Sequence, residues 1–95
     1  MATIRIDRGH ALPHAEARSA ADDLAKDLKR RFQLRYVWDG DDVLFERPGV
    51  TGRMHVGKNR FTLDVTLGFM LSAMKPTIER EIHAKLDKVA PTDAA

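Results

Sequence analysis

Apolar and polar residues alternate through the central third of the chain, and turn residues interrupt the alternation at regular intervals. A period of two is typical of strands that bury one face. Asp39-Gly40 is typical of a tight hairpin, with Asp41 and Asp42 expected as extra loop residues, and Pro48-Gly49 matches the two central positions of a type II turn. With a third turn at 57–60, the pattern predicts four antiparallel strands joined as a meander.

Outside this meander the pattern predicts one more strand and two amphipathic helices. Thr3–Arg8 alternates as a first strand. From Pro13 to about Phe32 the apolar spacing becomes three and four, with Pro13 at the first helical position, where its missing N–H costs nothing. A second helical stripe runs from Leu71 to Val89. Pro76 falls inside that stripe and predicts either a kink or a short turn before a helix that starts near Lys75.

The expected order is β-α-β-β-β-β-α, which indicates a two-layer α+β fold. An antiparallel sheet with one apolar face needs that face covered, and we expect both helices to lie on it. Residues 1–90 would form this single domain, and residues 91–95 a flexible C-terminal tail. The opposite face should be open and mostly polar. Its residues are Arg35, Val37, Leu44, Glu46, Thr51, Arg53, His55, Thr62, Asp64 and Thr66.

Composition narrows the classes of protein further. The 95 residues are enough for one core, and the absence of cysteine excludes disulfides and thiolate chemistry. The N-terminus lacks the apolar segment of a secretory signal, and the longest apolar run, 67–74, is far short of the roughly 20 residues of a membrane span. We therefore expect a cytoplasmic protein without a transmembrane segment.

Nucleic-acid binding is not indicated. Sixteen basic and 14 acidic residues give a net charge of only +2. Arg35, Arg53 and His55 could form a basic patch on the open face, but the aromatic residues of the strands fall on the inward phase and could not stack on bases. They are Tyr36, Trp38, Phe45 and Phe61. A solvated face explains the three basic residues better.

No catalytic, cofactor-binding or metal-binding constellation is recognisable. His10 and His14 have a metal-ligand spacing, yet no third ligand stands nearby, so a loop histidine or a helix contact is the better interpretation. Neither serine lies in a nucleophile elbow. The aspartates of 39–42 lack the pattern of a calcium loop.

The start of the second helix is the one segment that a structural role does not fully explain. Phe69 projects almost opposite to the apolar stripe, and Met70 lies at or beyond its edge. If the helix includes them, they form an exposed apolar patch of the kind that marks a contact surface. The alternative, which we favour, is a bend at 68–70 that tucks both side chains under the sheet edge.

With these motifs considered, the chain resembles the polyhydroxyalkanoic acid system proteins, a bacterial family encoded near polyester-granule storage genes. The most specific part is Trp38-x-Gly40-Asp41 followed by Gly49-Val50-x-Gly52, and the likeness runs from about Thr3 to Val89. Pro76 departs from the family pattern. The other matching residues are Ile4-Arg5-Ile6, Arg8, His10, Ala17-Arg18, Leu24, Tyr36, Phe45-Glu46-Arg47, Leu67-Gly68, Ile78-Glu79-Arg80-Glu81-Ile82 and Leu86.

The resemblance implies a role around polyhydroxyalkanoate storage and transfers no catalytic residues. Our first hypothesis is a non-enzymatic accessory protein that contacts a protein partner or the granule surface. Phe69, Met70, Val37 and Leu44 would supply the apolar contact. A homodimer through a free sheet edge or the Phe69 region is a further expectation.

Two other hypotheses remain open. The first is a small hydrophobic or acyl ligand held between sheet and helices, with Tyr36, Trp38 or Arg53 as polar anchors. The second is an enzyme, for which Arg8, His10 and Trp38 are the residues to inspect.

Overall fold

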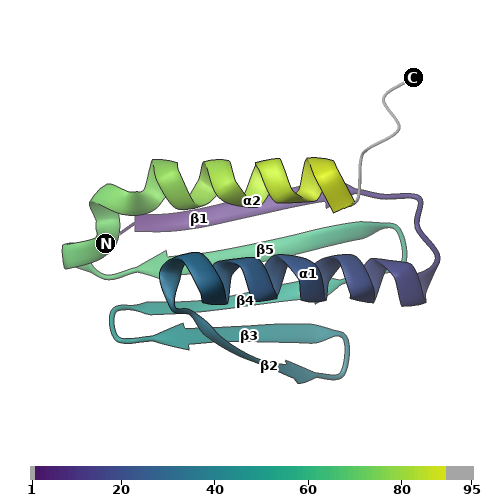
Figure 1. Cartoon of the computed structure of the whole chain (residues 1–95), viewed down its shortest axis with the longest axis horizontal. Helices are drawn as coiled ribbons and strands as arrows, with labels where there is room; N and C mark the ends of the chain where they lie inside the picture. The colour runs from purple at the N-terminus through teal and green to yellow at the C-terminus, as the bar shows by residue number, and fades with distance from the viewer. Residues whose placement is uncertain (1, 90–95) are drawn as a thin grey trace.

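The computed structural model describes residues 2–89, which form a five-stranded antiparallel sheet with two α-helices on one of its faces (Figure 1). The strands are β1 (Ala2–Gly9), β2 (Arg35–Asp39), β3 (Asp42–Arg47), β4 (Val50–Val56) and β5 (Arg60–Leu67). The helices are α1 (His14–Phe32) and α2 (Lys75–Val89), and a 3-10 helix, η1 (Phe69–Met74), precedes α2. The sheet order is β1-β5-β4-β3-β2, so β1 and β2 are its edges. The predicted α+β fold and order of elements are confirmed.

The core lies between the sheet and the helices because the strands alternate strictly. The inward residues of β5 are each no more than 1% exposed: Phe61, Leu63, Val65 and Leu67. From the other layer, Leu24 and Leu28 of α1 and Ile82 and Leu86 of α2 are buried against them. The residues predicted for the opposite face are all exposed or half-buried. One face of the sheet is therefore covered and the other is open, as the alternation predicted.

The two helices run antiparallel across the covered face (Figure 1). Helix α1 begins at His14, one residue later than predicted, because Pro13 has the extended ψ of 152° and stands just before the helix. Its carbonyl still accepts the N–H of Ala17 at 2.9 Å. At the other end, Gln33 adopts a left-handed φ of 57° and donates its N–H to Lys29 at 3.0 Å, which closes the helix and turns the chain into β2.

The hairpins follow from residues that permit positive φ. Gly49 has φ +85°, the value that a type II turn requires at its second central position, so the prediction for Pro48-Gly49 is confirmed. Gly40 has φ +61° and begins a two-residue loop. The prediction that Asp42 is a loop residue is wrong, because Asp42 pairs with Asp39 as the first residue of β3.

The region around Pro76 shows the second of the two predicted alternatives. A short 3-10 helix precedes α2, which starts at Lys75 with Pro76 in its first turn, where no helical hydrogen bond needs the proline N–H. No helix among residues 2–89 is long and apolar enough to cross a membrane. The flexible tail predicted for residues 91–95 lies outside the described residues.

Candidate interaction surfaces

The connection from β5 to α2 carries the most exposed large apolar side chains of residues 2–89. Phe69 is 82% exposed and Met70 is 87% exposed. The expectation that both side chains tuck under the sheet edge is wrong. The 3-10 turn instead directs Leu71 toward the core, and its two predecessors point outward. Phe69, Met70 and Leu71 are referred to below as the apolar tip.

One backbone hydrogen bond holds the apolar tip against the β3–β4 turn, and two local hydrogen bonds fix the conformation of the tip itself. Gly68 donates its N–H to the carbonyl of Gly49 at 2.7 Å, and Leu71 donates its N–H to the carbonyl of Gly68 at 3.0 Å. The hydroxyl of Ser72 donates to the carbonyl of Phe69 at 2.9 Å. A Cβ on Gly68 would lie 3.2 Å from the Gly49 carbonyl oxygen, and a Cβ on Gly49 would lie 3.3 Å from Leu71 Cδ1, so both glycines permit the close approach. The tip is thus presented from fixed backbone.

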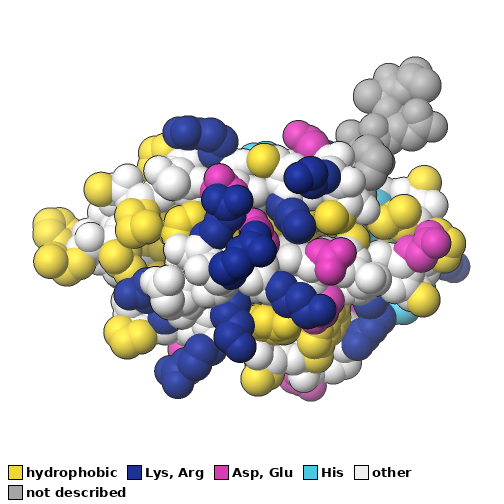
Figure 2. All heavy atoms as spheres, in the orientation of Figure 1, with side chains coloured by type: hydrophobic (Ala, Val, Ile, Leu, Met, Phe, Trp, Pro, Cys, Tyr) yellow, Lys and Arg dark blue, Asp and Glu magenta, His cyan; other side chains and the backbone are white. Residues whose placement is uncertain are grey.

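A shallow cleft of about 420 Å³ separates the tip from the turn. It is lined by Arg47, Pro48, Gly49, Gly68, Phe69, Met70 and Leu71. Apolar side chains gather at the same end of the molecule in Figure 2, where η1 lies in Figure 1. The arrangement can therefore make apolar contact without any change of fold.

The second predicted apolar pair lies on the open sheet face beside the β2 edge. Val37 is 62% exposed and pairs across strands with the half-buried Leu44. On the same face, Arg53 Nε lies 3.7 Å from an Asp42 carboxylate oxygen, and His55 Nδ1 lies 2.6 Å from the other. The open face is therefore a mixed, largely solvated surface, as the sequence indicated.

Trp38 is a structural residue at the junction of β2 and α1. Its indole N–H donates to Asp22 Oδ1 at 3.0 Å, and the Arg18 guanidinium stacks 4.2 Å from the ring centroid. The Trp38 hydrogen bond, helped by Lys26, holds the pKa of Asp22 below its usual value. Burial, followed by the charge of Asp22, raises the pKa of Tyr36. These side chains attach β2 to the helix layer.

His10 is buried and bonded on both sides of its ring. Nδ1 accepts the N–H of Leu12 at 3.1 Å, and Nε2 lies 3.1 Å from the Gly57 carbonyl oxygen, which it can contact only as a donor. The ring centroid also lies 4.5 Å from that of Phe61. This geometry agrees with the interpretation of His10 as a loop histidine that ties the β1–α1 connection to the β4–β5 turn.

Arg8 and Trp38 are far apart in the fold. Arg8 extends from β1 to α2, where its guanidinium lies 2.7 Å from an Asp87 carboxylate oxygen and 3.3 Å from the carbonyl of His83. Trp38 lies on β2, at the opposite edge of the sheet. The structure therefore does not bring Arg8 and Trp38 into one site.

His14, the other candidate metal ligand, contacts Asp41. The hydrogen bonds from His14 and Arg18 hold the pKa of Asp41 below its usual value. Residues 2–89 contain no group of three or more side chains suited to hold a metal ion.

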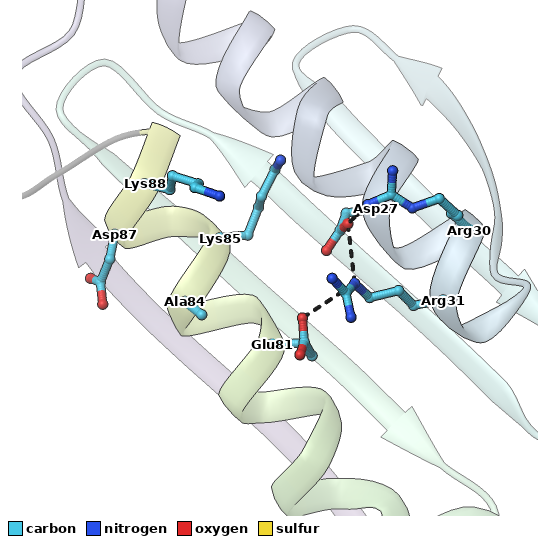
Figure 3. Close-up of a pocket in the computed structure, with 8 residues that line it drawn as sticks. All are labelled: Asp27, Arg30, Arg31, Glu81, Ala84, Lys85, Asp87 and Lys88. Carbon is cyan, nitrogen blue, oxygen red and sulfur yellow. Dashed lines mark hydrogen bonds and ion pairs between the residues drawn. The ribbon is translucent and has the colours of Figure 1, made fainter.

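Sequence reasoning missed a charged cleft of about 530 Å³ between the helices (Figure 3). Asp27, only 6% exposed, forms ion pairs with Arg30 and Arg31, and Arg31 Nε also lies 3.4 Å from a Glu81 carboxylate oxygen. Lys85 and Lys88 line the same cleft. The i,i+3 and i,i+4 spacing of Asp27 to the arginines was visible in the sequence. The partner across the cleft depended on the tertiary arrangement of the helices.

These features define a small two-layer α+β domain with an open sheet face and an exposed apolar tip. The family described as "Putative polyhydroxyalkanoic acid system protein" matches residues 4–89, so the chain belongs to this family and the resemblance is confirmed. Comparison with curated proteins and with solved structures gave no match.

Proposed function

We propose that this protein is a non-enzymatic accessory protein of the polyhydroxyalkanoate storage system that attaches to the granule surface through its apolar tip. The observation that carries the proposal is the exposure of Phe69 and Met70, at 82% and 87%, in consecutive positions on a braced turn. Exposed large apolar side chains that stand together are typical of contact surfaces. Family membership supplies the storage context.

The size of the tip favours an apolar surface over a protein partner. A stable protein–protein interface buries about 800 Å² on each side, spread over roughly 20 residues or more. Two protruding side chains and a shallow cleft offer much less. Insertion into an apolar boundary requires no complementary partner shape and needs only that the side chains leave water. An aliphatic polyester provides such a boundary, and the protein would then reside in the cytoplasm at storage granules.

The placement of the candidate catalytic residues supports a non-enzymatic role. Arg8, His10 and Trp38 each make specific contacts with neighbouring elements, and these contacts explain their presence. A ligand held between sheet and helices receives less support. The clefts found among the described residues open at the surface and are not enclosed between the sheet and the helices. The inward residues of β5 are fully packed.

Co-sedimentation with granules from accumulating cells tests the proposal. We expect Phe69→Asp and Met70→Asp to remain folded, because both side chains are exposed, and to appear in the soluble fraction, because a carboxylate resists transfer out of water. Ala11→Asp, an exposed position in the β1–α1 connection, is the matched control and should sediment like the wild type. Val37→Asp tests the other apolar pair. Undiminished sedimentation of the Phe69→Asp/Met70→Asp double variant would refute the role of the tip.

A further inference from the structure

The β2 edge of the sheet is unpaired among residues 2–89, and its sequence is complementary to itself. Figure 1 shows no described element beyond β2 on its outer side. The strand reads Arg-Tyr-Val-Trp-Asp over residues 35–39. When a second copy is placed antiparallel with Val37 opposite Val37, Arg35 lies opposite Asp39 twice. Tyr36 then lies opposite Trp38. Such a pairing has the twofold symmetry of an isologous interface.

The hydrogen-bonding groups of β2 fit this arrangement. N–H and C=O groups point to alternate sides along a strand. The Asp41 carbonyl accepts the N–H of Val56 in β4 at 2.8 Å. The backbone N–H and C=O groups of every second residue after Asp41 therefore point toward β4, and those of the residues in between point toward β2. Leu44 is one of the latter, and it pairs with Val37. The backbone groups of Val37 are therefore occupied within the protein.

The backbone N–H and C=O groups of Tyr36 and Trp38 point away from β3, toward the free edge of the sheet. No other described residue accepts from or donates to them. In the twofold pairing they meet each other, Tyr36 against Trp38, and form four hydrogen bonds across the axis. Val37 and the Arg35–Asp39 pairs fall at non-hydrogen-bonded positions, where opposing side chains approach most closely.

The side chains at these positions are available for a partner. Arg35, Val37 and Asp39 all project on the open face and are exposed. Arg35 has only a distant ion pair, 3.7 Å to Glu46, and Asp39 has none with another described residue. The strand also lacks the proline, lysine and inward charge by which edge strands commonly avoid pairing.

The other edge does not offer the same complementarity. On β1, Arg5 is already paired with Asp64 at 2.9 Å and Asp7 with Arg60 at 2.6 Å. The covered side of β1 is further occupied by Arg8, which reaches α2. The charges that could select a partner there are used within the protein, so β2 is the better edge for self-association.

We propose that two copies of this protein associate through β2 to form a continuous ten-stranded antiparallel sheet. All helices then lie on one face, and the open faces join on the other. The twofold rotation places the two apolar tips at opposite ends of the strands, so the tips take no part in this contact. The inference therefore goes beyond the proposed function and does not depend on it. A five-residue strand is a short interface, so we expect a dissociation constant roughly in the micromolar range.

Sedimentation velocity over a concentration series tests the dimer by charge exchange. The Arg35→Asp substitution places a carboxylate opposite the carboxylate of Asp39 in the other copy. The Asp39→Arg substitution places a guanidinium opposite that of Arg35. Because of the twofold symmetry, each of these repulsive contacts occurs twice in the dimer. We expect each single variant to weaken dimerisation by about ten- to a hundred-fold. The double variant Arg35→Asp/Asp39→Arg restores opposite charges and should regain an affinity close to that of the wild type. Lys58→Asp makes the same charge change in the exposed β4–β5 turn and should not alter dimerisation.

A further variant tests whether dimerisation can be lost while the protein remains folded. Val37→Lys replaces an exposed side chain and places two ammonium groups at the axis, so it should be a folded monomer by circular dichroism and sedimentation. The proposal is wrong if the wild type is monomeric up to about 1 mM, a range that covers weak interfaces of this size. It is equally wrong if the single exchanges leave the dimer unchanged, or if the double exchange does not restore it.

Discussion

Gly52 is the position where the close packing of the sheet can be tested most sharply. It lies in β4 between Phe45 of β3 and Val65 of β5. A Cβ placed on Gly52 would lie 3.0 Å from Val65 Cγ2 and 3.1 Å from the carbonyl oxygen of Asp64. Ordinary contacts of a Cβ begin near 3.4 Å. We therefore predict that Gly52→Ala destabilises the protein, although alanine is the better strand residue.

Two opposing effects determine how much Gly52→Ala changes the free energy of unfolding. Overpacking costs about 1–3 kcal/mol, because β5 is paired on both sides and its backbone cannot shift freely. Removing the extra freedom of glycine in the unfolded chain returns about 0.5–1 kcal/mol. The difference is centred near ~1.25 kcal/mol, which for a domain of this size lowers the midpoint of thermal unfolding by about 5–10 °C.

Thermal and urea unfolding followed by circular dichroism measure this effect. Gly9→Ala is the matched control, because its Cβ would lie 3.7 Å from the Asn59 carbonyl oxygen, an ordinary contact. It should be neutral or stabilising by up to about 1 kcal/mol. A Gly52→Ala variant as stable as the wild type, or a Gly9→Ala variant equally destabilised, would refute the reasoning.

Two further predictions concern side chains that carry polar contacts in the core layer. Because the folded pKa of Asp22 is lowered, its contribution to stability is present above the ordinary pKa near 3.8 and is lost as pH falls through the lower folded pKa. Trp38→Phe removes the main cause of that shift, so we expect a smaller loss of thermal stability below pH 4 than in the wild type; an unchanged acid profile would contradict this. His10→Ala leaves the N–H of Leu12 and the carbonyl of Gly57 without their partners and should lower the free energy of unfolding by about 2–4 kcal/mol in a urea titration, whereas a change below about 0.5 kcal/mol would show that the ring is not structural.

Local patterns were sufficient for most of the fold. The strict alternation of β5 and the glycines of the two hairpins predicted strands and turns from chemistry that acts over a few residues. The expectation for Asp42 failed because a two-residue loop satisfied the hairpin, and pairing with Asp39 then extended the strands. The length of such a loop depends on how well the strands pair, which the turn residues alone do not show.

The surfaces were harder to predict than the fold. The helical projection of Phe69 and Met70 raised the question of exposure, but their environment depends on how Gly68 and Leu71 contact a turn nearly 20 residues earlier. The ion pair of Arg31 with Glu81 likewise joins two helices that are far apart in the chain. Tertiary contacts of this kind leave no periodic signal in the sequence.

Binding to protein-free polyhydroxyalkanoate particles tests the central claim most directly, because no partner protein is present. Complete burial of a Phe or Met side chain is worth about 1.5–3 kcal/mol, and more than four-fifths of Phe69 and of Met70 is available. Loss of either anchor should therefore weaken binding by about ten-fold or more. We predict that the wild type and Ala11→Asp bind the bare particles and that Phe69→Asp/Met70→Asp remains in solution. Failure of the wild type to bind, or equal binding of the double variant, would contradict attachment to the granule surface through the apolar tip.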